Sequence, residues 1–387
     1  MKSMKRVYYL GFYDIEQNKS ENRNCVLSAT NKMRYIIDTI ETCGHSVEVI
    51  SASQTLNSVG YPGKVLEIGK RSRLHLFRTL KWGNKVRRVL SRHDMHHQVY
   101  RYLLRTLKKE DTVIAYHSVA YMNLLLKAKK KIGFRLILEV EEIYADVAGN
   151  AKGRAQEEQF FKYADAYIFP TQLLDKTINT LKKPSVIIHG TYQVESKRGQ
   201  NIFLETDKMP NTVHCVYAGT FDSKKGGCIA AITTVEYLPS NYHVHILGFG
   251  TEKDKQAVKD CIAQTSEKSV ATVTFDGLLS GEEYIRFIQS CEIGLSTQNP
   301  DAEFNATSFP SKILSYMANG LRVVSIRIPA IEQSAVGDCL HYYEKQAPEE
   351  IAKAILSVDF SDGYDGRTII SNLDSSFRQN LAELLGE

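Results

Sequence analysis

Stretches typical of β-strands alternate with stretches typical of α-helices along almost the whole chain, and this alternation constrains the fold more than any other feature. A second series of this kind runs from 213 to 326. Its strands are apolar nearly throughout, as strands covered on both faces are. The order predicts an α/β architecture in which helices wrap parallel sheets in doubly wound, Rossmann-like domains. In the first series the strand-like runs are 6–13, 45–53, 111–118, 134–144, 165–171 and 184–192.

A polar stretch interrupts the alternation at 193–211 and contains Gly199 and Pro210. A chain of 387 residues is also too long for one ordinary hydrophobic core. We therefore predict an N-terminal domain at 1–192, a linker at 193–211 and a C-terminal domain at 212–387, whose last helix is able to pack back on the N-terminal domain. Ligands bind outside the carboxyl ends of parallel strands, so we expect the two domains to face each other across a cleft that holds the site.

Composition excludes several classes of protein. Hydrophobic residues make up 43% of the chain and charged residues 24%, as in ordinary soluble globular proteins. No run of about 18 apolar residues is present, and the apolar run near the N-terminus is too short for a signal peptide. The seven cysteines form no CxxC pair, which predicts reduced thiols in the cytoplasm and no structural zinc.

Positive charge is concentrated between 64 and 109, where fourteen Lys or Arg residues accompany two acidic ones. Leu74, Phe77, Trp82, Val86 and Leu90 lie among these charges, as in a basic amphipathic helix on a lipid surface. A solvated helical face is the simpler alternative. We favour contact between residues 64–109 and an anionic membrane surface, and expect no nucleic-acid partner because no nucleic-acid motif accompanies the charges.

Two glycine-containing turns follow strands of the second series. Glycines let backbone amides approach a ligand and lysines add positive charge, which suits a diphosphate. An ordinary turn between a strand and a helix also uses these residues, so both interpretations remain open. The second turn lacks the three-glycine dinucleotide fingerprint, so we interpret it as a tight loop near a ligand and not as an NAD site. The candidates are Gly219, Thr220, Lys225 and Gly226 in the first turn and Gly248 in the second.

A third loop lies in "FNATSFPSKILSYMANGLRVVS", 304–325, where a polar segment becomes a helix. Ser308, Ser311 and Lys312 lie at this start, and Pro310 occupies a position that helix starts tolerate. We expect Ser311 to cap the helix and Lys312, with the first free amides, to hold phosphate oxygens. Capping plus a surface lysine is the alternative. Three loops that converge at one sheet edge favour the phosphate interpretation.

In the first series, "EVEEIY" places Glu139, Glu141 and Glu142 at the end of an apolar strand. Alternation along that strand puts Glu139 and Glu141 on one face. Such carboxylates are candidate general bases for an acceptor hydroxyl, while N-capping or salt bridges to the basic region are the alternative. His117, which ends the strand-like "IAYH", is a further catalytic candidate, although a lone histidine is often only structural.

The second series also resembles a known family. "SFPSKILSYMANGLRVVS" is similar to the donor-site segment of GT-B fold glycosyltransferases, particularly the large retaining family of cell-surface-polysaccharide enzymes. "YAGTFDSKKGG" resembles that family's donor-phosphate loop. "VTFDGLLSGEEYIRFIQSCEIGLS" resembles its base-binding segment and adds Asp276 and Gly277 to the expected site. The resemblance covers the second domain and, loosely, the order of elements in the first. It implies a nucleoside-diphosphate sugar as donor, with no cofactor and no metal.

Several positions depart from that family's pattern. Its retaining members carry two glutamates eight positions apart, and alignment places Thr307 and Ser315 there. Glu303 lies nearby in the sequence and is a candidate to contact the sugar instead. Thr220 stands where the family often has arginine, whereas Lys225 matches its lysine. Glu141 and Glu142 replace its His-Asp pair. Retention or inversion of stereochemistry therefore stays open.

Together these features predict a cytoplasmic glycosyltransferase, peripheral on the inner face of the membrane. It would move a sugar from a UDP- or GDP-linked donor to a glycan or lipid-linked acceptor in surface polysaccharide synthesis. One alternative, motivated by the missing glutamates, is a non-catalytic nucleotide-sugar-binding subunit of a glycosyltransferase complex. The other is a nucleotide-sugar epimerase on the same fold, which needs no acceptor.

Overall fold

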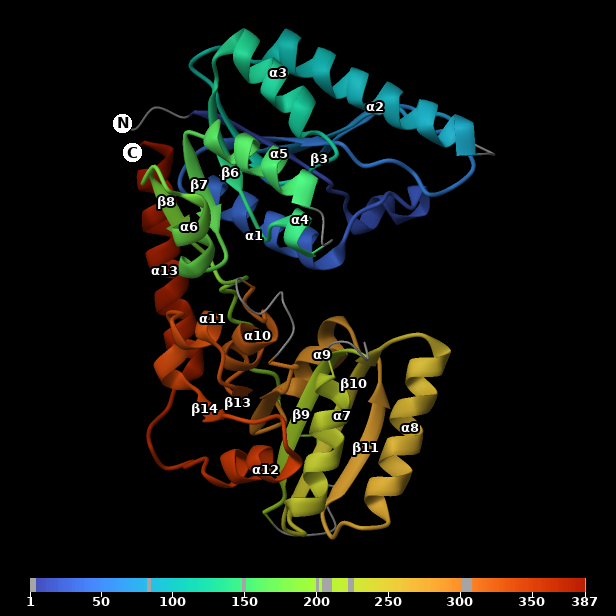
Figure 1. Ribbon diagram of the computed structural model, residues 1–387, viewed down its shortest axis with the longest axis vertical. Helices are drawn as coiled ribbons and strands as arrows, with labels where there is room; N and C mark the ends of the chain where they lie inside the picture. The colour runs from blue at the N-terminus through green and yellow to red at the C-terminus, as the bar shows by residue number, and fades with distance from the viewer. Residues whose placement is uncertain are drawn as a thin grey trace. The chain divides into compact units, whose positions relative to one another are not determined.

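The computed structural model describes residues 5–81, 85–147, 151–199, 202–203, 211–221, 226–300 and 308–386. The chain divides into two compact units (Figure 1). The first unit combines Met1–Ile188 with Ser376–Glu387, and the second is His189–Ser375. The division at Ile188 places the segment expected to be a linker within the second unit. There the Arg198 amide donates to Gln289 at 2.7 Å, and the Ile202 amide donates to Ser290 at 3.2 Å.

Among the described residues, the first unit contains an eight-stranded sheet in the order β3-β4-β2-β1-β5-β6-β7-β8. All neighbouring strands are parallel except β3 and β4, which pair antiparallel. The strands are β1 (Arg6–Gly11), β2 (Ser46–Ser51), β3 (Lys64–Glu67), β4 (Ser72–Leu76), β5 (Thr112–Tyr116), β6 (Arg135–Glu139), β7 (Ala166–Phe169) and β8 (Ser185–Ile187). The helical segments are η1 (Glu16–Glu21), α1 (Leu27–Thr42), α2 (Lys85–Thr106), α3 (Met122–Ile132), α4 (Tyr144–Val147), α5 (Ala151–Lys162) and α6 (Gln172–Ile178).

Alternation along the strands of this sheet sends successive side chains to opposite faces. Tyr8 and Leu10 of β1 belong to a core cluster with residues of α2, α3 and α5. On the opposite face, a Cβ added to Gly11 would lie 2.3 Å from the methyl carbon of Met33, so α1 crosses there. Tyr9 shares that face with Gly11, as do Tyr116 and Glu139, which follow in register. The face covered by α1 therefore carries polar groups at the carboxyl ends of its strands.

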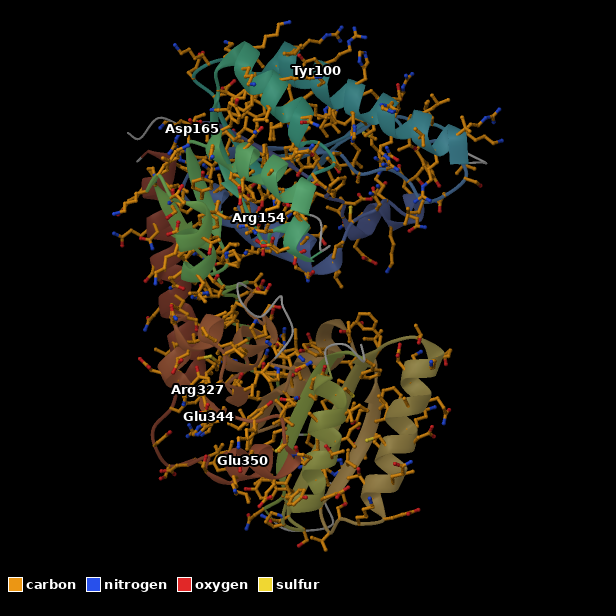
Figure 2. The ribbon with its side chains drawn as sticks, in the orientation of Figure 1. Tyr100, Arg154, Asp165, Arg327, Glu344 and Glu350 are labelled. Atoms are coloured by element: carbon orange, nitrogen blue, oxygen red, sulfur yellow. The ribbon has the colours of Figure 1, made fainter. Side chains whose placement is uncertain are left out.

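Basic residues 64–109 form two kinds of structure rather than one amphipathic helix. Residues 64–76 contain β3 and β4, and among the described residues of the range the helical ones are Lys85–Thr106. Charge in the hairpin is partly paired, since Arg73 lies 2.9 Å from Glu67 and Lys64 lies 2.6 Å from Glu21. The predicted basic helix is therefore confined to α2, the helix on which Tyr100 is labelled in Figure 2.

In the described part of the second unit, a six-stranded parallel sheet has the order β11-β10-β9-β12-β13-β14. Its strands are β9 (Val213–Thr220), β10 (Tyr242–Phe249), β11 (Thr272–Gly277), β12 (Ile293–Ser296), β13 (Arg322–Ile326) and β14 (His341–Tyr343). The helical segments are α7 (Gly227–Thr233), η2 (Thr234–Tyr237), α8 (Glu252–Ser266), α9 (Gly281–Ile288), α10 (Lys312–Ala318), α11 (Pro329–Glu332), η4 (Gly337–Cys339) and α12 (Pro348–Leu356). Renumbered within the unit, this is the 3-2-1-4-5-6 strand order of a Rossmann fold.

The apolar pattern of "FRQNLAELLGE" predicts a last helix at 377–387, whereas the observed helix, α13 (Gly366–Leu385), begins earlier. Asp365 explains its earlier start, because its carboxylate accepts hydrogen bonds from the Thr368 amide at 3.1 Å and the Thr368 hydroxyl at 2.6 Å. The Phe377 ring stacks on Tyr35 of α1 at a centroid distance of 5.6 Å, within the first unit. In the stretches that the structure describes, no helix is both long and apolar enough to cross a lipid bilayer.

Candidate functional site

Among the parallel strands of each sheet the strand order reverses at one point, and Rossmann-like domains bind ligands beyond the carboxyl ends of the strands there. In the second unit the reversal lies between β9 and β12, and in the first unit between β1 and β5. Helices that follow the strands on either side of such a point pack on opposite faces of the sheet, which leaves room for a ligand. These two strand ends are therefore where each unit's site residues should gather.

Strands β9 and β12 diverge at the reversal of the second sheet. Their pairing ends at Val216–Gly294, although β9 continues to Thr220. The buried side chain of Tyr316, from α10, lies beside this gap in the pairing, and its hydroxyl accepts a hydrogen bond from the Ala218 amide at 2.8 Å. A Cβ added to Gly294 would lie 2.3 Å from the Tyr316 ring, so this approach requires glycine. The helix start that carries the predicted lysine is thus anchored to the diverging strands.

Lys312 and Gly219, both predicted from the sequence, lie together at this point. The Lys312 Nζ lies 3.8 Å from the centroid of the Tyr217 ring. A Cβ added to Gly219 would lie 2.9 Å from the same Nζ. Sequence reasoning missed Tyr217. The available indication was an aromatic residue two positions before Gly219, close to the carboxyl end of the strand.

The other predicted glycines also have backbone reasons for their identity. Gly248 has φ +151°, and an added Cβ would lie 1.8 Å from the Gly219 carbonyl oxygen, because β9 and β10 run closely side by side. Gly226 has φ +63°, the left-handed conformation, immediately before α7. Thr220 ends β9, and its carbonyl accepts a hydrogen bond from the Tyr217 hydroxyl at 3.3 Å. The backbone therefore requires glycine at Gly248 and Gly226, while Thr220 contacts Tyr217 at the end of β9.

The predicted capping role of Ser311 is wrong. Ser311 has φ −55° and ψ −20°, so it already has helical geometry, and its side chain makes no capping hydrogen bond. An N-cap side chain reaches the helix amides only from an extended backbone. Ser311 is exposed and Ser308 is half-buried, both at the start of α10.

Asp276 and Gly277 lie at the end of β11, which β10 separates from β9. The Asp276 carboxylate lies 3.3 Å from His245 Nδ1 and accepts a hydrogen bond from the Thr274 hydroxyl at 2.9 Å. Burial raises the pKa of Asp276, but the hydrogen bonds from His245 and Thr274 outweigh burial and hold the pKa below its usual value. Gly277 has φ +81°. The structure therefore places this pair two strands away from Gly219, with β10 between them.

Ser315, which stands where the resembled family has a glutamate, lies one turn after Lys312 on α10. Ser315 forms a hydrogen bond with the hydroxyl of Tyr284 of α9. Burial raises the pKa of Tyr284, and this hydrogen bond partly offsets the rise. The hydroxyl groups of Ser315 and Tyr284 thus lie where the resembled family has the carboxylate of a glutamate. Three predicted site residues, Lys225, Glu303 and Thr307, lie outside the described residues.

In the first unit, strand β6 ends at Glu139, so the alternation expected through Glu141 stops there. Glu139 is fully buried, and its carboxyl accepts a hydrogen bond from the Tyr9 hydroxyl. Burial, followed by the charge of Glu141, raises the pKa of Glu139 to about 8. The Glu141 carboxylate lies 2.6 Å from Lys32 of α1 and is partly exposed. Glu139 is therefore closed to solvent, whereas Glu141 and Glu142 are both partly exposed.

His117 follows β5 and is buried. Its ring packs against Tyr144 and Phe161 at centroid distances of 5.0 Å, and its Nε2 lies 3.2 Å from Glu157 Oε1. Burial lowers the pKa of His117 to about 4, so the ring is neutral near pH 7. Glu157 accepts hydrogen bonds from the Tyr144 and Ala145 amides, which fixes the start of α4. The surroundings of His117 are those of a structural histidine.

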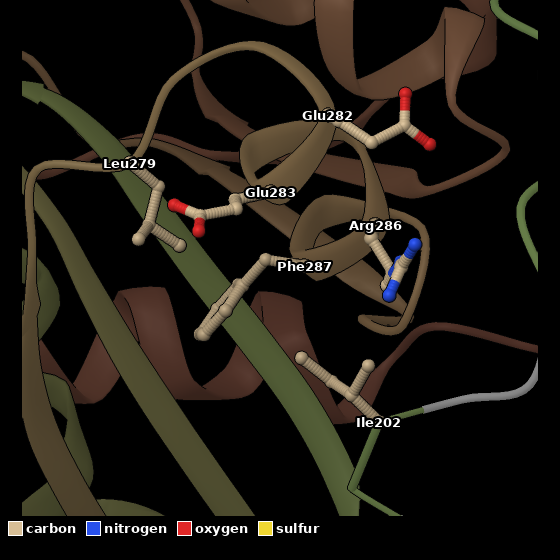
Figure 3. Close-up of a pocket in the computed structure, with 6 residues that line it drawn as sticks. All are labelled: Ile202, Leu279, Glu282, Glu283, Arg286 and Phe287. Carbon is tan, nitrogen blue, oxygen red and sulfur yellow. The ribbon is translucent and has the colours of Figure 1, made fainter.

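A shallow pocket of about 260 Å³ lies along α9 (Figure 3). The Leu279, Phe287 and Ile202 side chains form its apolar part, with Glu282, Glu283 and Arg286 at its rim. None of the predicted site residues lines it. Among the predicted donor residues that the structure describes, Gly219 and Lys312 lie together at the reversal between β9 and β12, whereas Asp276 and Gly277 lie at the end of β11.

Comparison with solved structures identifies the architecture as the GT-B class, two Rossmann-like domains in one chain, and confirms the predicted fold. The apo structure of OtsA, a trehalose-6-phosphate synthase, matches over 99% of both chains with a TM-score of 0.68 and 10% identity. The UDP-forming α,α-trehalose-phosphate synthase of Burkholderia xenovorans in complex with glucose-6-phosphate matches 98% of this chain and 97% of its own. Its TM-score is 0.67 and its identity 9%.

A third similar structure, from E. coli, is bound with UDP-2-fluoroglucose and has a TM-score of 0.60 at 10% identity over 98% of both chains. No protein-family profile and no curated protein sequence matches this chain. At identities this low, the comparisons establish the fold alone.

Proposed function

We propose that this protein is a glycosyltransferase that moves a sugar from a nucleoside-diphosphate sugar to an acceptor hydroxyl. The observation that carries the proposal is the position of Lys312 and Gly219 at the strand reversal of a GT-B fold. The structures that share this fold over their whole length include UDP-forming synthases and one bound with a UDP-sugar analogue.

The chemistry requires that negative charge on the departing diphosphate be stabilised. Lys312 supplies a positive charge beside Gly219, whose lack of a side chain leaves room for the ammonium group. We expect the transfer to proceed without a metal, as the resemblance implies. In the first unit Glu141 and Glu142 are partly exposed and are the candidate bases, whereas Glu139 and His117 are enclosed.

For the acceptor we propose a glycan or lipid-linked glycan of surface polysaccharide synthesis. The support is the resemblance of the donor segment to enzymes of that pathway and the exposed start of α2. The glucose-6-phosphate complex of a similar structure makes a sugar phosphate the alternative acceptor. Two other functions fit the donor residues: a non-catalytic nucleotide-sugar-binding subunit and an epimerase.

The first prediction is that UDP or GDP, and the corresponding sugar nucleotides, raise the melting temperature of the protein while CMP does not. Incubation of the stabilising sugar nucleotide with a lipid-linked glycan, or with glucose-6-phosphate, in EDTA is expected to release nucleoside diphosphate and give a glycosylated product. Donor binding without turnover, restored by a partner protein, would instead support the subunit. An isomerised sugar nucleotide formed without acceptor would support the epimerase, and the absence of any nucleotide binding would refute all three.

We also propose peripheral attachment to an anionic membrane, on the cytoplasmic inner face, through the start of α2. Val86, Val89 and Leu90 are 70%, 48% and 57% exposed there. Arg87, Arg88 and Arg92 lie among them and are exposed. The buried side chains of this helix begin at Ser91 and continue with Met95, Val99 and Leu103. Apolar side chains flanked by arginines match a lipid surface with negative headgroups.

The second prediction concerns this surface. Changing Arg87, Arg88 and Arg92 to Gln should weaken binding to vesicles of phosphatidylglycerol and phosphatidylcholine by roughly 100-fold, at about 1 kcal/mol per charge. Co-flotation measures the effect. A charge-matched control, in which Lys253, Lys259 and Lys268 of the second unit become Gln, should float like wild type. Absence of wild-type flotation, or equal losses in both variants, would refute attachment through α2.

A further inference from the structure

Tyr217 is an aromatic side chain buried at the carboxyl end of β9. It is 3% exposed, and its ring is held on two sides. Its hydroxyl donates to the Thr220 carbonyl at 3.3 Å, and a Cβ added to Gly227 at the start of α7 would lie 3.1 Å from Tyr217 Cε2. The Thr297 hydroxyl in turn donates to the Gly227 carbonyl at 2.6 Å, which joins the end of β12 to the same packing. The Tyr217 ring is therefore a fixed surface.

The Lys312 ammonium lies on the face of this ring, with Nζ 3.8 Å from the centroid. Gly219 leaves the space that the amine occupies, since a Cβ there would lie 2.9 Å from Nζ and 3.2 Å from the Tyr217 hydroxyl. The backbone of the lysine is anchored separately, because Tyr316 on the same helix is hydrogen-bonded to Ala218. Both ends of the Lys312 side chain are thus positioned by β9.

A lysine side chain has several rotatable bonds, and holding it in one place opposes its conformational entropy. The face of a tyrosine ring attracts an ammonium group by about 0.5–2 kcal/mol, depending on its exposure to solvent. A cation that is already held where an anion will bind does not have to be ordered during binding, so affinity increases.

We propose that Tyr217 is a positioning residue, whose ring holds the Lys312 ammonium beside Gly219 in readiness for the diphosphate of the donor. This inference rests on the proposed function for its ligand. The contact itself is present without a ligand. In this proposal Tyr217 contacts the lysine that binds the diphosphate, and not the substrate itself.

The test compares Tyr217→Phe, which keeps the ring, with Tyr217→Leu, which removes it. Isothermal titration uses inorganic pyrophosphate, UDP and GDP as probes. Tyr217→Leu should raise the Kd about three- to tenfold, the range of a partly desolvated cation–π contact, whereas Tyr217→Phe should stay within about twofold of wild type. In a Lys312→Met background, Tyr217→Leu should have no further effect, because the cation it positions is gone.

A second readout requires no ligand. In protein labelled with ¹³C at the lysine ε-carbons, the Lys312 ε-protons should resonate upfield of the other lysines, because they lie over the ring. Lys312→Met identifies that signal. Tyr217→Leu should abolish the shift and Tyr217→Phe should retain it.

The outcomes are distinguishable. If wild-type protein binds none of the three probes, both the proposed function and this inference fail. If it binds a probe and Tyr217→Leu leaves the Kd unchanged, or weakens binding equally with and without Lys312, the inference alone is overturned. A Lys312 resonance without an upfield shift would also overturn it, even if Tyr217→Leu proves too unstable for titration.

Discussion

Lys312→Ala is expected to weaken binding of UDP or GDP by roughly 10- to 100-fold, the loss that follows removal of a charged hydrogen-bond donor. The reason is geometric: among the described residues around the β9–β12 reversal, Lys312 carries the positive charge that lies against Gly219. Isothermal titration with each nucleotide measures the change. Binding by wild-type protein should also weaken as salt increases, and the variant should lose most of this dependence.

A matched control is Lys353→Ala, in an exposed position on α12 where Lys353 lies 2.9 Å from Glu350 (Figure 2). An exposed ion pair of this kind contributes little to stability, so the control should bind nucleotide like wild type. Equal affinity of wild type and Lys312→Ala would remove the assignment of the donor site to the start of α10. A loss shared by both lysine variants would point to a nonspecific effect of net charge.

Glu139→Gln is expected to remove a large part of the pH dependence of stability of the first unit. Burial raises the pKa of Glu139 from 4.5 to about 8, so the folded unit keeps the proton over a range in which the unfolded chain releases it. Stabilisation from this group is full below pH 4.5 and is lost as the pH rises to about 8. The total loss is roughly 5 kcal/mol at 1.36 kcal/mol per pKa unit.

Glutamine stays neutral at every pH and retains an oxygen to accept the Tyr9 hydroxyl hydrogen bond, so its profile should be flatter between pH 5 and 8. Urea denaturation at several pH values, followed through Trp82, the single tryptophan of the chain, measures the difference. Glu110→Gln at an exposed position should leave the profile unchanged. Parallel profiles for wild type and Glu139→Gln would show that Glu139 is ionised in the folded protein, with Lys32 as its counter-charge.

Most of the fold was predictable because parallel sheets leave a clear pattern: buried strands form short apolar runs, and glycine follows many helices. Strand β9 was predicted at 213–220 and is observed at Val213–Thr220. The β3–β4 hairpin was missed because its strands have four and five residues, and β3 alternates between half-buried and exposed positions. Such short, charged edge strands carry little of the apolar pattern on which prediction depends.

The candidate site was predicted less completely, for a different physical reason. Gly219 and Lys312 could be brought together because both were assigned to the carboxyl edge of one sheet. Tyr217 could not be predicted, because its role depends on the direction of its side chain relative to α10, nearly a hundred residues later in the sequence. Glu139 was predicted to share the solvent-facing role of Glu141, but the strand ends between them and leaves Glu139 enclosed. Burial of that kind is decided by packing from α1, which the local sequence does not encode.

The discontinuous first unit has a consequence for how the chain is made. Its described strands have all been synthesised by Ile188, yet Phe377, which stacks on Tyr35, and Leu381, which is fully buried, follow the second unit in the sequence. During translation the apolar surface of the first unit that α13 covers is therefore exposed until the second unit has been synthesised. Domains of a nascent chain generally fold in order from the N-terminus. Here the first unit, which begins first, is completed only after the second unit has been synthesised, because α13 supplies the contact with Tyr35 of α1.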